Sequence, residues 1–273
     1  MRKKHKRGSY RLQNIGQMRT DPLIMHTIQA GTVTHGTPNL RFWLVSAAIP
    51  LLLLGFIVAA KAVGGNVEYW VLKSQIGVLE SLTGGLALAA SIVALATFFH
   101  PAIRHDWKLR IWIFLLFLAT LYFAGEDLNW GQYYFGWDAP QYFQEHNREQ
   151  ETNLHNMSPW LNQKPRLVFE FWLLIAGILV PLGWRLPQQL TRRFIPSELW
   201  PDGRLIVPAM LAFLLKVPDW FKWIEIVPQV SLSTIRWSEV QELYFAYCML
   251  LYAHLVFDRI RQSPVSFTAQ HRG

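Results

Sequence analysis

Long apolar stretches alternate with polar ones along this chain, and their lengths are the first guide to its structure. The first stretch runs from Phe42 to Ala60 without a charged residue. A helix of about 20 such residues crosses the ~30 Å hydrocarbon core of a bilayer. Five further apolar runs follow. We therefore predict six transmembrane helices, at about residues 42–62, 76–99, 109–126, 166–184, 204–221 and 239–257.

The predicted fold class is an all-α integral membrane protein, a six-helix transmembrane bundle with both termini in the cytoplasm. The transmembrane domain covers residues 41–262. Residues 1–40 form a basic cytoplasmic tail without hydrophobic periodicity and are expected to be disordered. A second cytoplasmic tail covers residues 263–273. A cleaved signal peptide is the competing interpretation of the first run, but the apolar core of such a peptide is only about 7–15 residues long and lies near the N-terminus.

The distribution of charge predicts the orientation of the bundle. With six spans, the segments on the side of the termini hold 18 of the 26 Lys and Arg residues, and the positive-inside rule places that side in the cytoplasm. The net charge of +8 then reflects topology and does not indicate nucleic-acid binding. The basic run at residues 2–7 either contacts anionic lipid headgroups or only fixes the topology.

The longest outer connection, residues 126–164, is rich in Trp, Tyr and Phe. Because Trp and Tyr favour the headgroup level, we expect this aromatic-rich loop to lie on the outer membrane surface. Further along, Ser238 and Gln241 match a capping box that would start the sixth helix. The single Cys248 excludes an intrachain disulfide and is interpreted as a small buried hydrophobic residue.

Two polar strings beside the third span carry most of the candidate chemistry. Residues 125–132 read GEDLNWGQ and residues 150–156 read QETNLHN. Carboxylates at the end of a membrane span are costly to desolvate, so Glu126 and Asp127 are candidates for function. Glu151 and His155 are four residues apart and would share one face if this stretch were helical.

The predicted catalytic residues are the acids and the histidine that approach the outer membrane interface: Glu126, Asp127, His155, Glu151 and Glu80. Glu170, Glu239 and Glu242 approach the same interface. Such a group suits either a divalent metal, with Glu126, Asp127 and His155 as ligands, or a pair of acid and base carboxyls. Structural explanations compete throughout, since the same residues can cap helices, form a Glu–His pair or favour a helix N-terminus.

These polar strings resemble a group of uncharacterised bacterial multi-pass inner-membrane proteins. The resemblance rests on Gly-Glu-Asp-x-x-Trp-Gly-Gln at residues 125–132 and Glu-Thr-Asn-Leu-His-Asn at residues 151–156, and it extends over about residues 70–160. The group's pattern has Glu where this chain has Asp127, and Gly where it has Gln150. The resemblance implies a location in the bacterial inner membrane and no particular activity.

Three functional hypotheses follow from the sequence. The first is an enzyme that acts on a lipid or lipid-linked substrate at the outer membrane face. The second is an ion-coupled transporter, which would need polar groups at mid-membrane depth on several helices. The third is a structural or accessory membrane protein without catalysis. Membrane lipids are the expected partners, protein partners are left open by the sequence, and the chain contains no soluble-enzyme motif.

Overall fold

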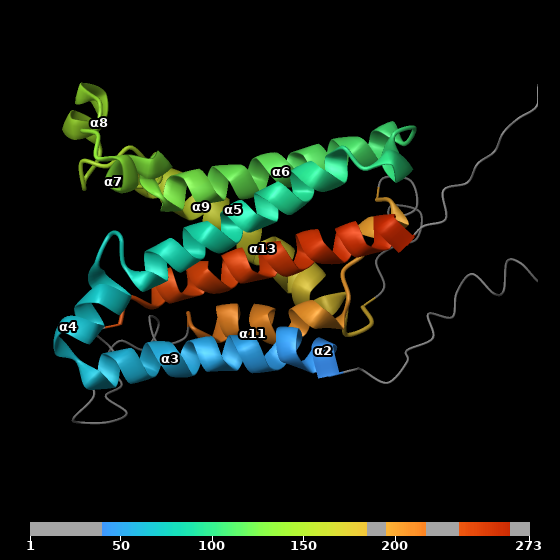
Figure 1. The fold of residues 1–273 in the computed structure, drawn as a ribbon, viewed down its shortest axis with the longest axis horizontal. Coiled ribbons are helices and arrows are strands. Elements are labelled where there is room, and N and C mark those ends of the chain that lie inside the picture. Colours follow the sequence, from blue (N-terminus) through green and yellow to red (C-terminus); the bar gives the residue numbers. More distant parts are fainter. Residues whose placement is uncertain (1–39, 185–194, 217–234, 263–273) are drawn as a thin grey trace, which may run out of the picture. The chain divides into compact units, whose positions relative to one another are not determined.

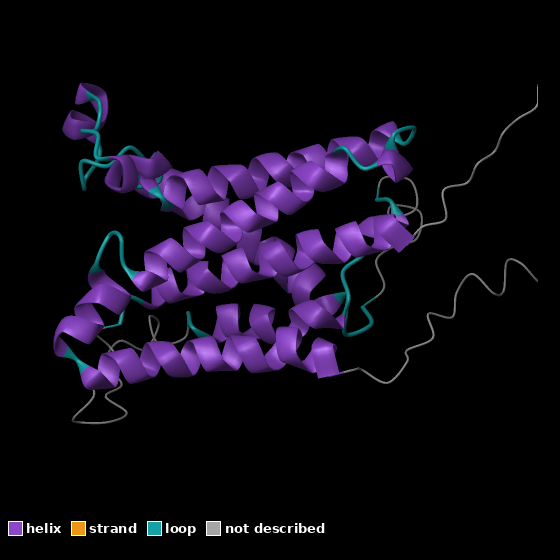
Figure 2. Ribbon diagram, viewed as in Figure 1, coloured by secondary structure: helices purple, strands orange, loops and turns teal. Residues whose placement is uncertain are grey.

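The computed structural model describes residues 40–184, 195–216 and 235–262, all within one structural unit. Within these residues every regular element is a helix and no strand occurs (Figure 2). The all-α prediction is therefore confirmed for the described part of the chain. The expected tails at residues 1–39 and 263–273 lie outside the described residues.

Four helices in the described ranges are long and apolar enough to cross a membrane, which indicates a membrane protein. The first span, Leu40–Val63, joins three elements, and the second, Gly65–Phe98, joins three more. The third and fourth are single helices. In chain order the elements are α2 (Leu40–Trp43), the π-helix η1 (Leu44–Ala48), α3 (Ile49–Val63), α4 (Gly65–Glu68), the π-helix η2 (Tyr69–Lys73), α5 (Val78–Phe98), α6 (Trp107–Asp127) and α13 (Trp237–Gln262).

The fourth and fifth expected spans have a different form. Helix α9 (Pro159–Trp172) continues directly into the π-helix η5 (Leu173–Leu179), so this helix begins before the predicted residue 166. Helix α11 (Ile206–Leu214) has nine residues, about 13 Å at 1.5 Å per residue, and residues 217–234 lie outside the described ranges. The six-span count therefore stays a prediction.

Short helices make the connections. The 3-10 helix η3 (Pro101–Ile103) joins α5 to α6, and Asp106 caps α6 by accepting a hydrogen bond of 3.0 Å from the Leu109 N–H. The aromatic-rich loop contains η4 (Asn129–Gly131), α7 (Gln132–Phe135) and α8 (Gln141–His146). Two further 3-10 helices, η6 (Ser197–Leu199) and η7 (Gly203–Leu205), precede α11.

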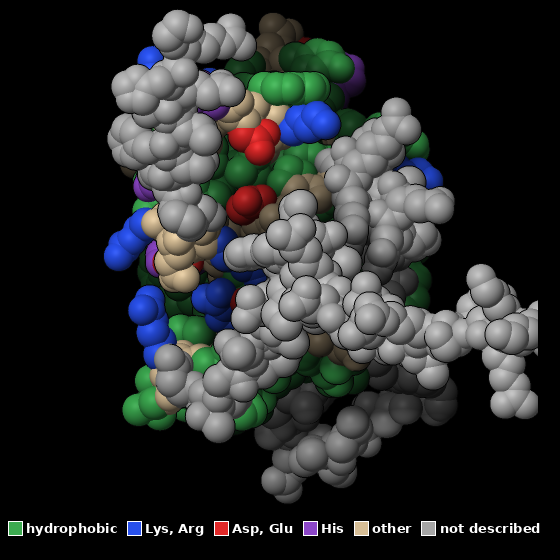
Figure 3. All heavy atoms as spheres, turned by 90° about the vertical axis from the view of Figure 1, so that its right-hand side faces the viewer, with side chains coloured by type: hydrophobic (Ala, Val, Ile, Leu, Met, Phe, Trp, Pro, Cys, Tyr) green, Lys and Arg blue, Asp and Glu red, His purple; other side chains and the backbone are tan. Residues whose placement is uncertain are grey.

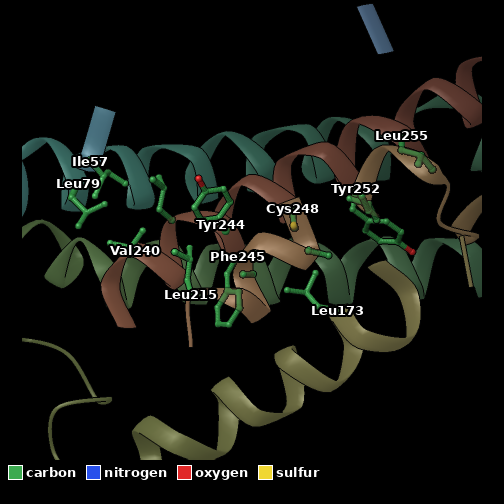
Figure 4. Packing of buried hydrophobic residues seen from close by; sticks show 14 of the residues in the cluster. Ile57, Leu79, Leu173, Leu215, Val240, Tyr244, Phe245, Cys248, Tyr252 and Leu255 are labelled. Carbon is green, nitrogen blue, oxygen red and sulfur yellow. The ribbon is translucent and has the colours of Figure 1, made fainter. Parts of the chain in front are cut away.

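Helix α13 is the centre of the packing. In an apolar stretch of 18 residues within α13, 72% of the residues are buried, compared with 17% in the corresponding stretch of the span Leu40–Val63. It packs against α5 and α11, while α5 also packs against α6 (Figure 1). Tyr244, Phe245 and Cys248 of α13 are fully enclosed by their neighbours (Figure 4). Large apolar side chains on α3 and α6 remain exposed, as expected for helices that face lipid: Leu52, Phe56, Phe114, Leu115 and Leu118.

Two tyrosines of α13, Tyr244 and Tyr247, donate their hydroxyl groups to the backbone of the first span. Tyr244 donates to the Pro50 carbonyl at 2.7 Å and Tyr247 donates to the Val45 carbonyl at 2.6 Å. Val45 lies five residues before Pro50, which has no N–H to offer to a π-helical ladder. The hydroxyl of Tyr247 therefore gives the Val45 carbonyl the hydrogen bond that the missing N–H of Pro50 cannot give.

The two ends of this helix packing differ in charge. At one end, α5 and α13 begin and α6 ends, and acidic side chains from all three line a common cavity. At the other end, Lys and Arg side chains are visible together with Asp and Glu side chains among apolar ones (Figure 3). There Arg204 pairs with Asp202 at 2.9 Å and Arg259 donates to the Trp200 carbonyl, which ties the segment before α11 to the end of α13.

Candidate functional site

The close approach of α5 and α6 at the acidic end depends on a glycine. A Cβ atom at Gly84 would lie 2.3 Å from Leu128 Cγ, so any larger residue there would clash with the chain just after α6. This contact brings Glu80, in the first turn of α5, and Asp127, the last residue of α6, to the same cavity. Acidic residues of α5 and α6 therefore line one cavity.

Glu126 is the point at which the two polar strings meet. Its side chain is buried, with 5% exposed. One carboxylate oxygen, Oε2, accepts the backbone N–H groups of Leu154 at 2.7 Å and of His155 at 2.9 Å. The other oxygen, Oε1, accepts the indole N–H of Trp130 at 3.0 Å. Both oxygens of Glu126 therefore hold the surrounding loop.

The backbone after α6 has the shape needed to return Trp130 to Glu126. Asn129 and Trp130 have φ values of 50° and 53°, in the left-handed region, and Gly131 follows at 90°. Trp130 packs on Gly125, where a Cβ atom would lie 2.8 Å from the indole ring. The glycines and tryptophan of the first string thus have a structural role, which is to fold the chain back over the end of α6.

Amide side chains join the rest of the two strings. Gln132 Oε1 accepts both the backbone N–H of Thr152 at 2.7 Å and its hydroxyl at 2.8 Å. Asn153 donates its side-chain amide to Asn129 Oδ1 and to Glu151 Oε2. Residues 125–132 and 150–156 therefore form one hydrogen-bonded unit, which we call the paired loop.

Glu151 is as fully bonded as Glu126. With 2% of its surface exposed, it accepts the Tyr133 hydroxyl on Oε1 at 3.0 Å. Its other oxygen accepts the amides of Asn153 at 2.8 Å and Asn156 at 3.0 Å. Burial, together with the negative charge of Glu151, raises the pKa of Tyr133 to about 12, so the tyrosine keeps its proton and remains a donor.

His155 lies between the paired loop and the cavities. Its Nδ1 is 3.5 Å from Glu126 Oε2. Burial alone would lower the pKa of His155, but the carboxylates of Glu126, Glu242 and Glu151 raise it, and the net shift is upward. The helical arrangement considered for Glu151 and His155 is wrong, because residues 150–158 contain bends and a turn and no helix.

A polar cavity of about 130 Å³ lies where these elements meet. Two residues of its wall each carry a buried oxygen, Asp127 Oδ2 and Glu239 Oε2, without a hydrogen-bond partner among the described residues. Glu80 also lines the cavity. The complete wall consists of Gln75, Glu80, Asp127, Asn129, Glu149, Glu151, Asn153, His155, Asn156, Arg166, Arg236, Ser238, Glu239 and Glu242.

Two arginines bring positive charge to this wall, and the sequence analysis missed both. Arg166 of α9 donates to Gln241 Oε1 and to the Ser238 carbonyl at 3.1 Å, and its Nη1 is 3.4 Å from Glu242. Arg236 pairs with Glu239. The sequence signal that could have identified Arg166 is its place at the outer end of the fourth expected span, four residues before Glu170.

Gln241 does not form the expected capping box. Helix α13 begins at Trp237, before Ser238, and the Gln241 side chain instead donates to the Ala212 carbonyl at 3.0 Å and to Glu170 at 3.2 Å. Glu170 is further neutralised by Lys216 Nζ at 2.6 Å. This buried network joins α9, α11 and α13 beneath the polar cavity.

Two further cavities adjoin the polar cavity. A small cavity of about 80 Å³ shares Asp127, His155 and Glu242 with it. The small cavity in turn shares Tyr122, Phe123 and Pro165 with an apolar cavity of about 390 Å³. The apolar cavity lies among α6, α9 and α13, and its wall includes Trp112, Leu116, Ala119, Val168, Phe169 and Met249. Across the three neighbouring cavities the lining residues change from acidic to apolar.

The geometry does not fit the expected metal site. Among the described residues, no group of three or more His, Cys, Asp and Glu side chains is arranged to hold a metal ion, so Glu126, Asp127 and His155 do not form one. The bonding explains this result, because both oxygens of Glu126 already accept hydrogen bonds from the loop.

No protein-family model, curated protein or solved structure matches this chain. The resemblance to uncharacterised bacterial membrane proteins therefore stays a prediction. The paired loop nevertheless gives a physical reason for the two strings to occur together in one sequence, since each supplies the hydrogen-bond partners of the other.

Proposed function

We propose that this protein is a multi-pass protein of the bacterial inner membrane and an enzyme that acts on a lipid or lipid-linked substrate at the outer membrane face. The observation that carries the proposal is the lining that runs from the acidic cavity to the apolar cavity. A lipid has the same change of polarity, from headgroup to chain. The apolar cavity, at about 390 Å³, falls within the 300–1,000 Å³ range of small-molecule sites.

The proposed topology has six spans, with both termini in the cytoplasm. The Lys and Arg distribution of the sequence supports this orientation. The acidic cavity would then face the outside, and the opposite end, seen in Figure 3, would face the cytoplasm. Exposed Tyr and Trp side chains in the aromatic-rich loop suit the headgroup level on that outer side, among them Trp130, Tyr134 and Trp137.

The proposed site residues have different roles. Asp127, His155 and Glu80 line the polar cavity and are the groups that would exchange protons with a substrate. Glu126 and Glu151 are positioning residues, because their oxygens accept hydrogen bonds from the paired loop. The carboxylate of Glu126 would hold His155 in place, as acidic residues do for catalytic histidines in general.

A structural role without catalysis is the second candidate, and the saturated bonding of Glu126 and Glu151 favours it for those two residues. It does not account for Asp127 Oδ2, which has no hydrogen-bond partner among the described residues. Asp127 is therefore the residue that separates the two candidates.

The test compares membranes that contain the wild-type protein, Asp127→Asn or Asp138→Asn. Asp138 is exposed in the aromatic-rich loop and gives a matched control. Membranes would be incubated with a total bacterial lipid extract, and lipid species would be quantified by mass spectrometry. We expect one lipid to be converted by wild type and by Asp138→Asn, and not by Asp127→Asn. Equal conversion in all three samples would rule out the assignment of Asp127, and an unchanged lipid profile with wild type would favour the structural role.

A further inference from the structure

The charge in the polar cavity is unbalanced. Six carboxylate side chains contribute to its wall, and only two arginines and one histidine oppose them. Arg236 pairs with Glu239 and Arg166 lies near Glu242. Glu80 and Asp127 have no such cationic partner among the described side chains. Like charges around so small a space repel one another, which favours a ligand that brings positive charge.

The unpartnered oxygens indicate what kind of positive group would fit. Buried acceptors such as Asp127 Oδ2 and Glu239 Oε2 are nearly always hydrogen-bonded in folded proteins. A primary ammonium group offers three N–H donors and no acceptor, so it can serve both oxygens at once. A phosphate or carboxylate headgroup offers only acceptors and would face the same acids.

The position of these oxygens also constrains the rest of the ligand. Asp127 lines both the polar cavity and the small cavity. Tyr122 and Phe123 line the small cavity too and also border the apolar cavity, so a group bound at Asp127 has apolar surface beside it on the side of α6 and α9. The polar cavity, at about 130 Å³, suits a small headgroup.

We propose that the three cavities bind a single-chain lipid with a primary ammonium headgroup. The nitrogen would donate to Asp127 and Glu239, and the hydrocarbon chain would occupy the apolar cavity among α6, α9 and α13. This proposal rests on the proposed lipid site and adds the class of headgroup that the site selects.

The experiment is a competition measured by native mass spectrometry on the full chain purified in a non-ionic detergent. The protein would be mixed with equal amounts of dodecylamine, dodecanol and dodecanoate at pH 7. These probes share one chain and differ in the head: ammonium, neutral hydroxyl or carboxylate. The variants would be Asp127→Asn and Glu239→Gln, with Asp138→Asn as the exposed control.

The expected result is an ammonium adduct favoured about tenfold over the alcohol, because one hydrogen bond to a charged group is worth roughly a factor of ten or more. The preference should persist in Asp138→Asn and fall in Asp127→Asn and Glu239→Gln. A second series, from hexylamine to dodecylamine, should show tighter binding with the longer chain.

The possible failures are distinguishable. Equal binding of amine and alcohol, or a preference for dodecanoate, would overturn the headgroup assignment and leave the lipid site standing. A preference for the amine that survives in both variants would overturn the assignment of Asp127 and Glu239. Absence of any bound amphiphile would remove the lipid site itself, and with it the proposed function.

Discussion

Replacing Glu126 by Gln tests the central claim about the paired loop. The amide has nearly the same shape as the carboxylate, but one of its two ends donates hydrogen bonds. If the NH₂ group takes the place of Oε2, it faces the backbone N–H groups of Leu154 and His155. If it takes the place of Oε1, it faces only the indole N–H of Trp130.

The second orientation is the cheaper one, because one donor loses its acceptor instead of two. A buried donor left without a partner costs about 1–3 kcal/mol, so Glu126→Gln should lower the free energy of unfolding by about that amount. In Glu126→Ala all three donors lose their acceptor, and the loss should exceed about 3 kcal/mol. The number of donors that lose their acceptor therefore predicts a larger loss in the free energy of unfolding for Glu126→Ala than for Glu126→Gln.

The assay is unfolding of the purified protein in mixed micelles, followed by tryptophan fluorescence. Glu145→Gln is the matched control, since Glu145 lies exposed on α8. A Glu126→Gln protein as stable as wild type, or one destabilised no more than Glu145→Gln, would refute the view that this carboxylate holds the loop. Glu126→Gln and Glu126→Ala variants of equal stability would show that the individual donors do not matter.

Three further predictions follow from the packing and the charges. Gly84→Ala should destabilise the protein by about 1–3 kcal/mol in the same unfolding assay, and Leu128→Ala should relieve part of that cost, because the added Cβ atom would meet the Leu128 side chain. Ala119→Trp should fill the apolar cavity and weaken dodecylamine binding, with exposed Leu52→Trp on α3 as the control. The raised pKa of His155 should stabilise the folded state fully below about pH 6.5, its unfolded value, and this contribution should disappear as the pH rises through the higher folded pKa. Unfolding measured across that range should therefore depend less on pH in His155→Asn than in wild type.

The sequence was sufficient for the long apolar helices, because their pattern is local. Nineteen consecutive uncharged residues leave few alternatives to a membrane helix, and the first, second, third and sixth expected spans each correspond to a helix of the required kind. The bounds of the fourth expected span were harder to predict, because α9 contains a proline and two charged residues: Pro165, Arg166 and Glu170. The helix continues as a π-helix after Trp172. Its charges bond to other helices, which no local pattern reveals.

For the site, the sequence indicated which residues gather but not what each one contacts. Glu80, Asp127 and His155 were expected at a common interface and do line one cavity. The metal hypothesis had no geometric support because it assumed free carboxylates, and the donors to Glu126 come from residues 154 and 155, which lie far along the chain. Arg166 was missed for the same reason, since its partners on α13 are about 75 residues away.

The adjacent acids Glu126 and Asp127 show how one turn of helix can serve two purposes. Successive residues of an α-helix project about 100° apart, so neighbouring side chains point in different directions. At the end of α6, both acids border the small cavity, but Glu126 accepts the N–H groups of the paired loop, while Asp127 also lines the polar cavity and has one oxygen unpartnered among the described residues. Substitution of the first acid should therefore change the stability of the loop, and substitution of the second should change what the cavity binds. A pair of variants that both altered stability and left binding unchanged would contradict this division of roles.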